Sequence, residues 1–290
     1  MEAARRKGPL RFVVAQAADD TVLGAAAEAR RLGLGEFTLV GREAEIRAAA
    51  RRAAVDVEAF RIVEPPAGTS PALEAVRAVR AGEGQVLVKG LLPTAELMRE
   101  ALHPERGLAF GAHLSHVGVF VLPGRDRFLL VTDAALNIAP DLKEKAQIVQ
   151  NAIDLARRLG VEEPVAAILC AMENVNPRMP ATVDAACLSK MAERGQIRGG
   201  RVEGPLALDN AVDPEAVRQK GIRGDLAGHA DILVAPDIEA GNMLYKALQW
   251  FAGAEEAGVV VGGRAPIVVT SRADSRDGKL RSLALGVLAL

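Results

Sequence analysis

One stretch of the sequence decides the fold: residues 128–169 read FLLVTDAALNIAPDLKEKAQIVQNAIDLARRLGVEEPVAAIL. It opens with an apolar run, Phe128 to Thr132, passes through a polar loop into Leu142 to Leu159, and ends on a second apolar run, Val165 to Leu169. In the middle segment apolar side chains recur at helical spacing opposite charged ones, which is typical of an amphipathic helix lying on a sheet. Strand, helix and strand in this order form the repeating unit of a parallel α/β sheet.

The same alternation continues along nearly the whole chain. The other runs that we expect to form strands are Leu10–Ala15, Phe37–Val40, Phe60–Val63, Val86–Val88, Val117–Leu122, Ile232–Ala235, Val259–Val261 and Ile267–Thr270. Helical patterns lie between them, so the sequence predicts an α/β protein with mainly parallel sheets and flanking helices. Two composition cues mark possible domain boundaries, namely the polar loop after Thr132 and the Gly262-Gly263 turn.

Composition excludes several classes of protein. The 290 residues carry 36 basic and 37 acidic side chains, a formal net charge of -1, so the sequence favours neither a nucleic-acid-binding nor a disordered protein. Aromatic residues make up only 3%, which leaves an aliphatic core. Cys170 and Cys187 give no disulfide framework and fit a reducing compartment. No apolar stretch approaches the roughly 18 residues of a membrane span, and the N-terminus lacks a signal peptide, so we expect a cytoplasmic protein.

Candidate binding residues follow the predicted strands, because ligands of open parallel sheets bind beyond the carboxyl ends of the strands. Those that we expect to bind substrate are Lys89, Asp133, Asn137, Asn176, Asn242, Tyr245 and Lys246. Several of them have a structural alternative. Asp133 and Asn137 could organise a turn. Tyr245 could pack on the sheet, and Lys246 could extend to water.

The segment after the last strand carries the most reactive groups. It places Ser271 and Arg272 beside Asp274 and Asp277, so one turn offers a hydroxyl, a guanidinium and two carboxylates. Arg supplies planar donors suited to phosphate, and either carboxylate could accept a proton. The alternative is an Arg paired with a nearby Asp on a solvated loop, with serines capping the final helix.

Histidines and cysteines point to no further chemistry. His113, His116 and His229 have no carboxylate at a recognisable spacing, so we expect surface or hydrogen-bonded side chains rather than a general base. Cys170 ends an apolar run and reads as a small core residue. We expect no metal site. The sequence also lacks a phosphate-binding G-x-x-x-x-G-K-[ST] loop, a G-x-S-x-G elbow and a G-x-G-x-x-G fingerprint after the first strand.

Five strand-end segments, taken together and in this order, resemble the phosphate acetyltransferase and phosphate butyryltransferase family, and more closely its butyryl branch. They are residues 132–141, 173–182, 204–211, 236–242 with Tyr245-Lys246, and 265–275. Shorter forms within them, such as Asp133-x-x-x-Asn137 and Ser271-Arg272, resemble those of the acetyl branch as well.

The resemblance implies reversible transfer of a short acyl group from coenzyme A to inorganic phosphate, giving an acyl phosphate. It implies no tightly bound cofactor, with acyl-CoA and phosphate as partners and no nucleic acid or membrane. It also implies a homodimer of a two-domain fold similar to isocitrate and isopropylmalate dehydrogenases, with the active site in the interdomain cleft. In that layout residues 1–132 plus 264–290 form domain I, and residues 133–263 form domain II, the expected dimerisation domain.

The resemblance also assigns roles in the last segment. Arg272 would bind the phosphoryl group, and Ser271 would assist the thiol or the developing charge. A carboxylate a few residues later would take the thiol proton. The acetyl-branch aspartate falls on or beside Gly278 here, so Asp277 is the first candidate for the base and Asp274 the second.

Other functions remain open at this stage. One is a phosphate acetyltransferase that uses acetyl-CoA. Another is a metal-dependent dehydrogenase on the same fold, but Asp133, Asp209 and Asp237 have no recognisable ligand spacing. A third is a noncatalytic acyl-CoA-binding subunit, against which the intact Ser271-Arg272 pair argues.

Overall fold

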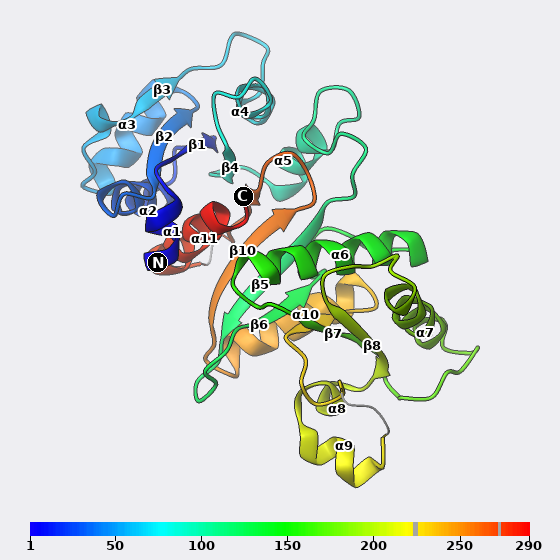
Figure 1. Cartoon of the computed structure of the whole chain (residues 1–290). Helices are drawn as coiled ribbons and strands as arrows, with labels where there is room; N and C mark the ends of the chain where they lie inside the picture. The colour runs from blue at the N-terminus through cyan, green and yellow to red at the C-terminus, as the bar shows by residue number, and fades with distance from the viewer. Residues whose placement is uncertain (223–225, 272–273) are drawn as a thin grey trace. The chain divides into compact units, whose positions relative to one another are not determined.

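The computed structural model describes residues 1–222, 226–271 and 274–290 and divides them into two compact units (Figure 1). Unit 1 comprises Met1–Leu114 and Ala257–Leu290, and unit 2 comprises Ser115–Glu256. The C-terminal segment therefore folds with the N-terminal one. The domain boundaries expected from the sequence, 132/133 and 263/264, stay a prediction.

The sheet of unit 1 has the strand order β3-β2-β1-β4-β11-β10. Its strands are β1 (Leu10–Ala15), β2 (Gly35–Val40), β3 (Arg61–Val63), β4 (Val86–Lys89), β10 (Glu255–Val261) and β11 (Ile267–Val268). Neighbouring strands run parallel except β10, which is antiparallel to β11. Because β4 and β11 are parallel neighbours, the segments that follow them, Gly90 after β4 and Val269-Thr270 after β11, leave the sheet at the same edge.

Helices cover this sheet with apolar faces. They are α1 (Glu2–Lys7), α2 (Asp20–Arg31), α3 (Glu43–Arg52), α4 (Pro71–Arg80), α5 (Thr94–Ala101) and α11 (Arg276–Leu288), with a short 3₁₀ turn at Val57–Ala59. Figure 1 shows the C-terminal α11 beside α1, and it also packs on α2. One hydrophobic cluster includes Phe12, Leu23 and Leu39 together with Leu283 and Val287 of α11, so the C-terminal helix completes the core of unit 1.

The sheet of unit 2 has the strand order β5-β6-β9-β7-β8. The strands are β5 (Ser115–Val121), β6 (Leu129–Thr132), β7 (Val165–Leu169), β8 (Arg201–Leu206) and β9 (Ile232–Val234). All pairs are parallel except β5 with β6. The helices are α6 (Leu142–Arg158), α7 (Pro180–Glu193), α8 (Leu208–Val212), α9 (Pro214–Lys220) and α10 (Ile238–Trp250). The long α6 begins with a capping box, in which Asp141 and Glu144 satisfy each other's backbone N–H groups.

The predicted fold class, α/β with mainly parallel sheets and flanking helices, is confirmed. The ten expected strands all form, and two of them, Leu10–Ala15 and Val165–Leu169, have the expected bounds. The sequence analysis did not predict β8, because this segment contains Glu203, Gly204 and Pro205, which are typical of a loop. Among the described residues, no helix combines the length and hydropathy that crossing a bilayer requires.

Candidate active site

Unit 1 brings Lys89 to the segment after β11. Lys89 ends β4 and is buried, and its Nζ donates to the carbonyl oxygens of Thr270 (3.2 Å) and Gly90 (3.4 Å). The parallel register of β4 and β11 explains this meeting, since both segments leave the sheet at one edge. The lysine ammonium therefore lies against the backbone of Thr270, the residue directly before Ser271.

The turn itself is held by a carboxylate. The Ser271 N–H donates to Asp274 Oδ2 at 2.6 Å. Ser275 then caps α11 by accepting from the N–H of Gly278, and Asp277 lies exposed in the first turn of that helix. Arg272 lies outside the described residues. The structure thus brings Ser271, Asp274 and Lys89 together, with Asp277 on the adjoining helix.

Lys279 is a member of this group that the sequence analysis missed. Its side chain is only 3% exposed, and its Nζ donates to the carbonyl oxygen of Ser271 at 2.6 Å. The charge of Lys279 also acts on Asp19, the N-cap of α2. Burial alone would raise the pKa of Asp19, but hydrogen bonds from Thr21 and Val22 and the charge of Lys279 together hold it below its usual value.

In unit 2, Asp133 organises the loop after β6. Its carboxylate is buried and accepts four hydrogen bonds. The backbone N–H groups of Ala135 and Leu136 donate to Oδ1, each at 2.9 Å. The backbone N–H of His116 (2.9 Å) and the Asn137 side-chain amide (2.6 Å) donate to Oδ2. Asp133 therefore fixes both Asn137 and the start of β5.

His116 is buried beside this carboxylate rather than on the surface. Its ring centroid lies 5.6 Å from that of Tyr245, and Nδ1 is buried without a hydrogen-bond partner in the part of the chain that the structure describes. Burial lowers the pKa of His116 below 6.5, the nearby Asp133 opposes this, and the charge of Lys246 adds to it. The neutral form of the imidazole is therefore favoured, and His116 is neither of the two expected kinds of side chain, since it is buried and its Nδ1 lacks a hydrogen-bond partner among the described residues.

Helix α10 places the remaining candidates against the Asp133 loop. Asp237 caps the helix by accepting from the N–H of Ala240. Asn242 Nδ2 donates to the carbonyl oxygen of Ala134 at 3.0 Å. A Cβ at Gly241 would lie 2.2 Å from the carbonyl oxygen of Asp133, so only glycine allows the helix to approach this closely.

Tyr245 and Lys246 take different positions on α10. The Tyr245 ring lies on β5, where a Cβ at Gly118 would come within 2.4 Å of it, so the tyrosine packs on the sheet. Lys246 Nζ donates to Gln249 Oε1 at 2.9 Å, and Gln249 in turn donates to the buried Glu256 at 2.8 Å.

Asn176 lies in a different loop, between β7 and α7. Its backbone N–H donates to Thr182 Oγ1 and its side-chain oxygen accepts from the N–H of Arg178, so it organises the approach to α7. Nearby, burial raises the pKa of Cys170 to about 11, with Lys145 opposing and Asp184 reinforcing this shift. Such a thiol is a poor nucleophile, as expected from its place in the sequence.

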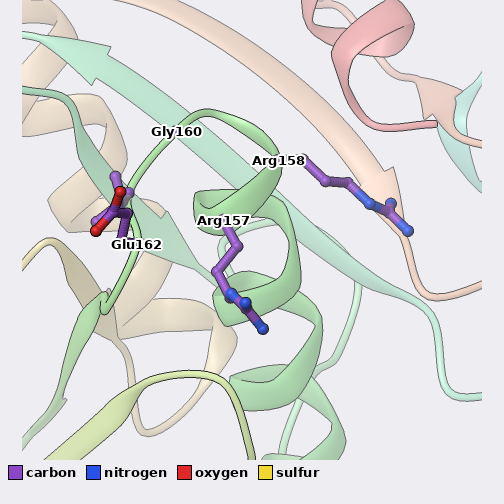
Figure 2. Close-up of a pocket in the computed structure, with 5 residues that line it drawn as sticks. Arg157, Arg158, Gly160 and Glu162 are labelled. Carbon is purple, nitrogen blue, oxygen red and sulfur yellow. The ribbon is translucent and has the colours of Figure 1, made fainter.

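A separate depression follows α6. It has a volume of about 630 Å³ and is lined by Arg157, Arg158, Gly160, Val161 and Glu162. Figure 2 shows the two arginine side chains extending away from Glu162. None of the candidate residues lines it. In the part of the chain that the structure describes, no group of three or more His, Cys, Asp or Glu side chains is arranged to hold a metal ion.

Comparison with known proteins decides the family. A family model described as phosphate acetyl/butaryl transferase matches residues 1–73 and 67–287. The chain belongs to this family. It is 50% identical to a phosphate acetyltransferase of Rhizobium meliloti over 99% of this chain and 90% of that protein. It is 45% identical to a phosphate butyryltransferase of Clostridium acetobutylicum over 96% of this chain and 92% of that protein. Relatives of this chain are thus named both as acetyltransferases and as butyryltransferases.

Solved structures agree with this membership. The crystal structure of a branched-chain phosphotransacylase from Enterococcus faecalis matches with a TM-score of 0.83 and 34% identity, covering 97% of this chain and 98% of that one. A 4-hydroxythreonine-4-phosphate dehydrogenase from Klebsiella pneumoniae matches with a TM-score of 0.57 at 15% identity, covering 98% and 100% of the two chains. The second likeness shows the fold alone, and it confirms the expected relation to a dehydrogenase-like fold.

Proposed function

We propose that this family member is a phosphate acyltransferase that catalyses acyl-CoA + phosphate = acyl phosphate + CoA for a short acyl group, by direct transfer. The observation that carries the proposal is the group of Lys89, Ser271 and Asp274 at one edge of the unit 1 sheet, in a segment that matches the family model. Relatives named as acetyl- and butyryltransferases support it.

The chemistry requires an oxygen nucleophile, a polarised thioester and a protonated leaving group. A phosphate oxygen attacks the thioester carbonyl, the carbon–sulfur bond breaks, and the thiolate takes up a proton to leave as CoA. Donors placed around the developing oxyanion and the phosphate stabilise this transition state. We assign that role to Arg272 and Ser271. Lys89 holds the preceding carbonyl oxygen, that of Thr270.

In the reverse direction a carboxylate must take the thiol proton, since most of a free thiol is protonated at neutral pH. Asp277 remains our first choice, because its side chain is exposed at the start of α11. Asp274 is the second choice, since one of its oxygens already accepts from the Ser271 N–H.

The candidates of unit 2 divide into two proposed roles. Asp133 acts as a positioning residue, because its four hydrogen bonds occupy both carboxylate oxygens. We propose that Asn137, Asn242 and Lys246 contact substrate. The other two expected substrate-binding residues, Asn176 and Tyr245, serve chiefly by shaping the loop before α7 and the surface of β5.

The remaining parts of the proposal concern the acyl substrate, the role of coenzyme A, the oligomeric state and the cellular location. We propose a butyryl-type acyl group, as the sequence resemblance favours, with phosphate acetyltransferase activity as the alternative that the Rhizobium meliloti relative favours. We further propose that coenzyme A is a substrate rather than a bound cofactor, and that the protein is a cytoplasmic homodimer. A noncatalytic acyl-CoA-binding subunit is the outcome if no turnover is found.

The test measures thiol release from butyryl-CoA and acetyl-CoA, with and without phosphate, in the wild type and in Arg272→Ala. We expect release that requires phosphate and falls by about 10²–10³ in the variant, the usual effect of losing one oxyanion donor. Arg264→Ala serves as a control, because Arg264 is an exposed arginine that stacks on Phe110, away from the turn. Absence of release from either thioester by folded protein would remove the proposal.

A further inference from the structure

We infer that Lys279 contacts the phosphate substrate through its ammonium group, as a cation that acts in addition to the proposed Arg272. This inference rests on the proposed function and adds a residue to it. Lys279 lies in α11 and is 3% exposed, although lysine is almost never fully buried unless it is paired.

The hydrogen bonds of Lys279 leave most of its donor capacity unused. A lysine ammonium has three N–H donors. Among the described residues, the carbonyl oxygen of Ser271 is the only hydrogen-bond acceptor of this one, at 2.6 Å. A buried charge with one neutral acceptor is unfavourable, so the remaining protons call for an anionic acceptor.

Asp19 only partly meets that need. Its carboxylate interacts with Lys279 through charge, but Oδ1 already accepts from the backbone N–H groups of Thr21 and Val22 and from the Thr21 hydroxyl. Oδ1 thus caps α2, and among the described residues no hydrogen bond joins this carboxylate to Lys279. It offsets part of the lysine charge without taking up the free N–H groups.

A purely structural role would not require a charged group. Holding one carbonyl oxygen needs one neutral N–H, which a glutamine supplies without burying a charge. The carbonyl that Lys279 holds belongs to Ser271, an exposed residue. The ammonium is therefore hydrogen-bonded to an exposed residue, and we place the phosphate oxygen that would complete its hydrogen bonds on that side.

The experiment compares Lys279→Met and Lys279→Arg with a matched control, Lys7→Met. Lys7 also donates to a backbone carbonyl of the same helix, that of Leu288 at 3.2 Å, but it lies at the opposite end from the turn. Two readouts are taken with inorganic phosphate as the probe. One is the KM for phosphate and for butyryl-CoA in thiol release, and the other is equilibrium binding of phosphate by calorimetry, which needs no turnover.

We expect Lys279→Met to weaken phosphate binding and raise the KM for phosphate by about 10- to 100-fold, the range for losing a hydrogen bond between charged groups. The KM for butyryl-CoA should stay within about twofold. Lys279→Arg should keep phosphate binding, and Lys7→Met should match the wild type. Far-UV circular dichroism checks that each variant is folded.

Two results would distinguish a failure of the Lys279 inference from a failure of the proposed acyl transfer. If Lys279→Met lowers kcat but binds phosphate as tightly as the wild type, the lysine only supports the turn and the inference is wrong. If wild-type protein binds phosphate through Lys279 but releases no thiol, the anion site stands and the proposed acyl transfer fails. Should Lys279→Met not fold, Lys279→Gln keeps the hydrogen bond to Ser271 and answers the same question.

Discussion

Replacing Asp133 by asparagine should destabilise unit 2 far more than the same change at Asp237. Both carboxylates follow a strand of unit 2. Asp133 accepts four hydrogen bonds, two at each oxygen, whereas Asp237 accepts one from the N–H of Ala240 at the start of α10. In Asp133→Asn one oxygen becomes an NH₂ group, which then faces two donors.

The magnitude follows from the bonds lost. If the remaining oxygen keeps Ala135 and Leu136, the amide of the variant meets the backbone N–H of His116 and the side-chain amide of Asn137. Hydrogen bonds to a charged group contribute about 1.5–3 kcal/mol each, so the loss of two predicts about 3–6 kcal/mol, reduced where the loop can relax. Asp237→Asn should change the free energy of unfolding by less than about 0.5 kcal/mol, because asparagine caps helices as well as aspartate does.

Urea unfolding resolves this difference within unit 2. The chain has one tryptophan, Trp250, and it belongs to unit 2, so its fluorescence follows that unit while circular dichroism follows both. We expect a lower fluorescence midpoint for Asp133→Asn. A loss below about 1 kcal/mol, or an equal loss in Asp237→Asn, would refute the idea that this carboxylate organises the loop.

Three further predictions concern single side chains. Burial lowers the pKa of His116 below 6.5, so below that pH the unfolded chain binds a proton that the native one does not. The free energy of unfolding should therefore fall with decreasing pH, by up to about 1.4 kcal/mol per unit below 6.5. Unfolding curves at pH 5.5 and 7 that coincide would contradict this, and His116→Gln should flatten the dependence. The pKa of Cys170 is about 11, against 9.0 for the ordinary thiol. At pH 8 Cys170 should therefore react with iodoacetamide about 100-fold more slowly in folded protein than in urea, measured in a variant in which it is the only cysteine. Gly241→Ala should destabilise by about 1–3 kcal/mol, because its Cβ would meet the Asp133 carbonyl oxygen. Gly278→Ala, whose Cβ has ordinary contacts, should be neutral or stabilising in the same assay.

The fold was predictable because apolar periodicity and strand ends are local signals. The exception is β8, where Gly204 and Pro205 interrupt the apolar run although the strand pairs with β7. The sequence alone allowed the hypothesis that Asp133 organises a turn. It did not predict the four hydrogen bonds that the Asp133 carboxylate accepts, because one donor is the N–H of His116, seventeen residues earlier, and another is the side chain of Asn137. Lys279 was missed because lysine is almost never fully buried, so its residue type predicts an exposed side chain, and only the tertiary structure shows it buried.

The charge that would attract phosphate is local in this protein. With a formal net charge of -1, the molecule as a whole gives an anion no long-range attraction. Unit 1 instead keeps two buried ammonium groups, those of Lys89 and Lys279, on consecutive carbonyl oxygens, Thr270 and Ser271. Buried charges are screened less by salt and by water than exposed ones, so they act strongly on a group in direct contact. Selectivity for phosphate would then arise at the Ser271 turn itself, after encounter, rather than from the field that brings the substrate to the protein.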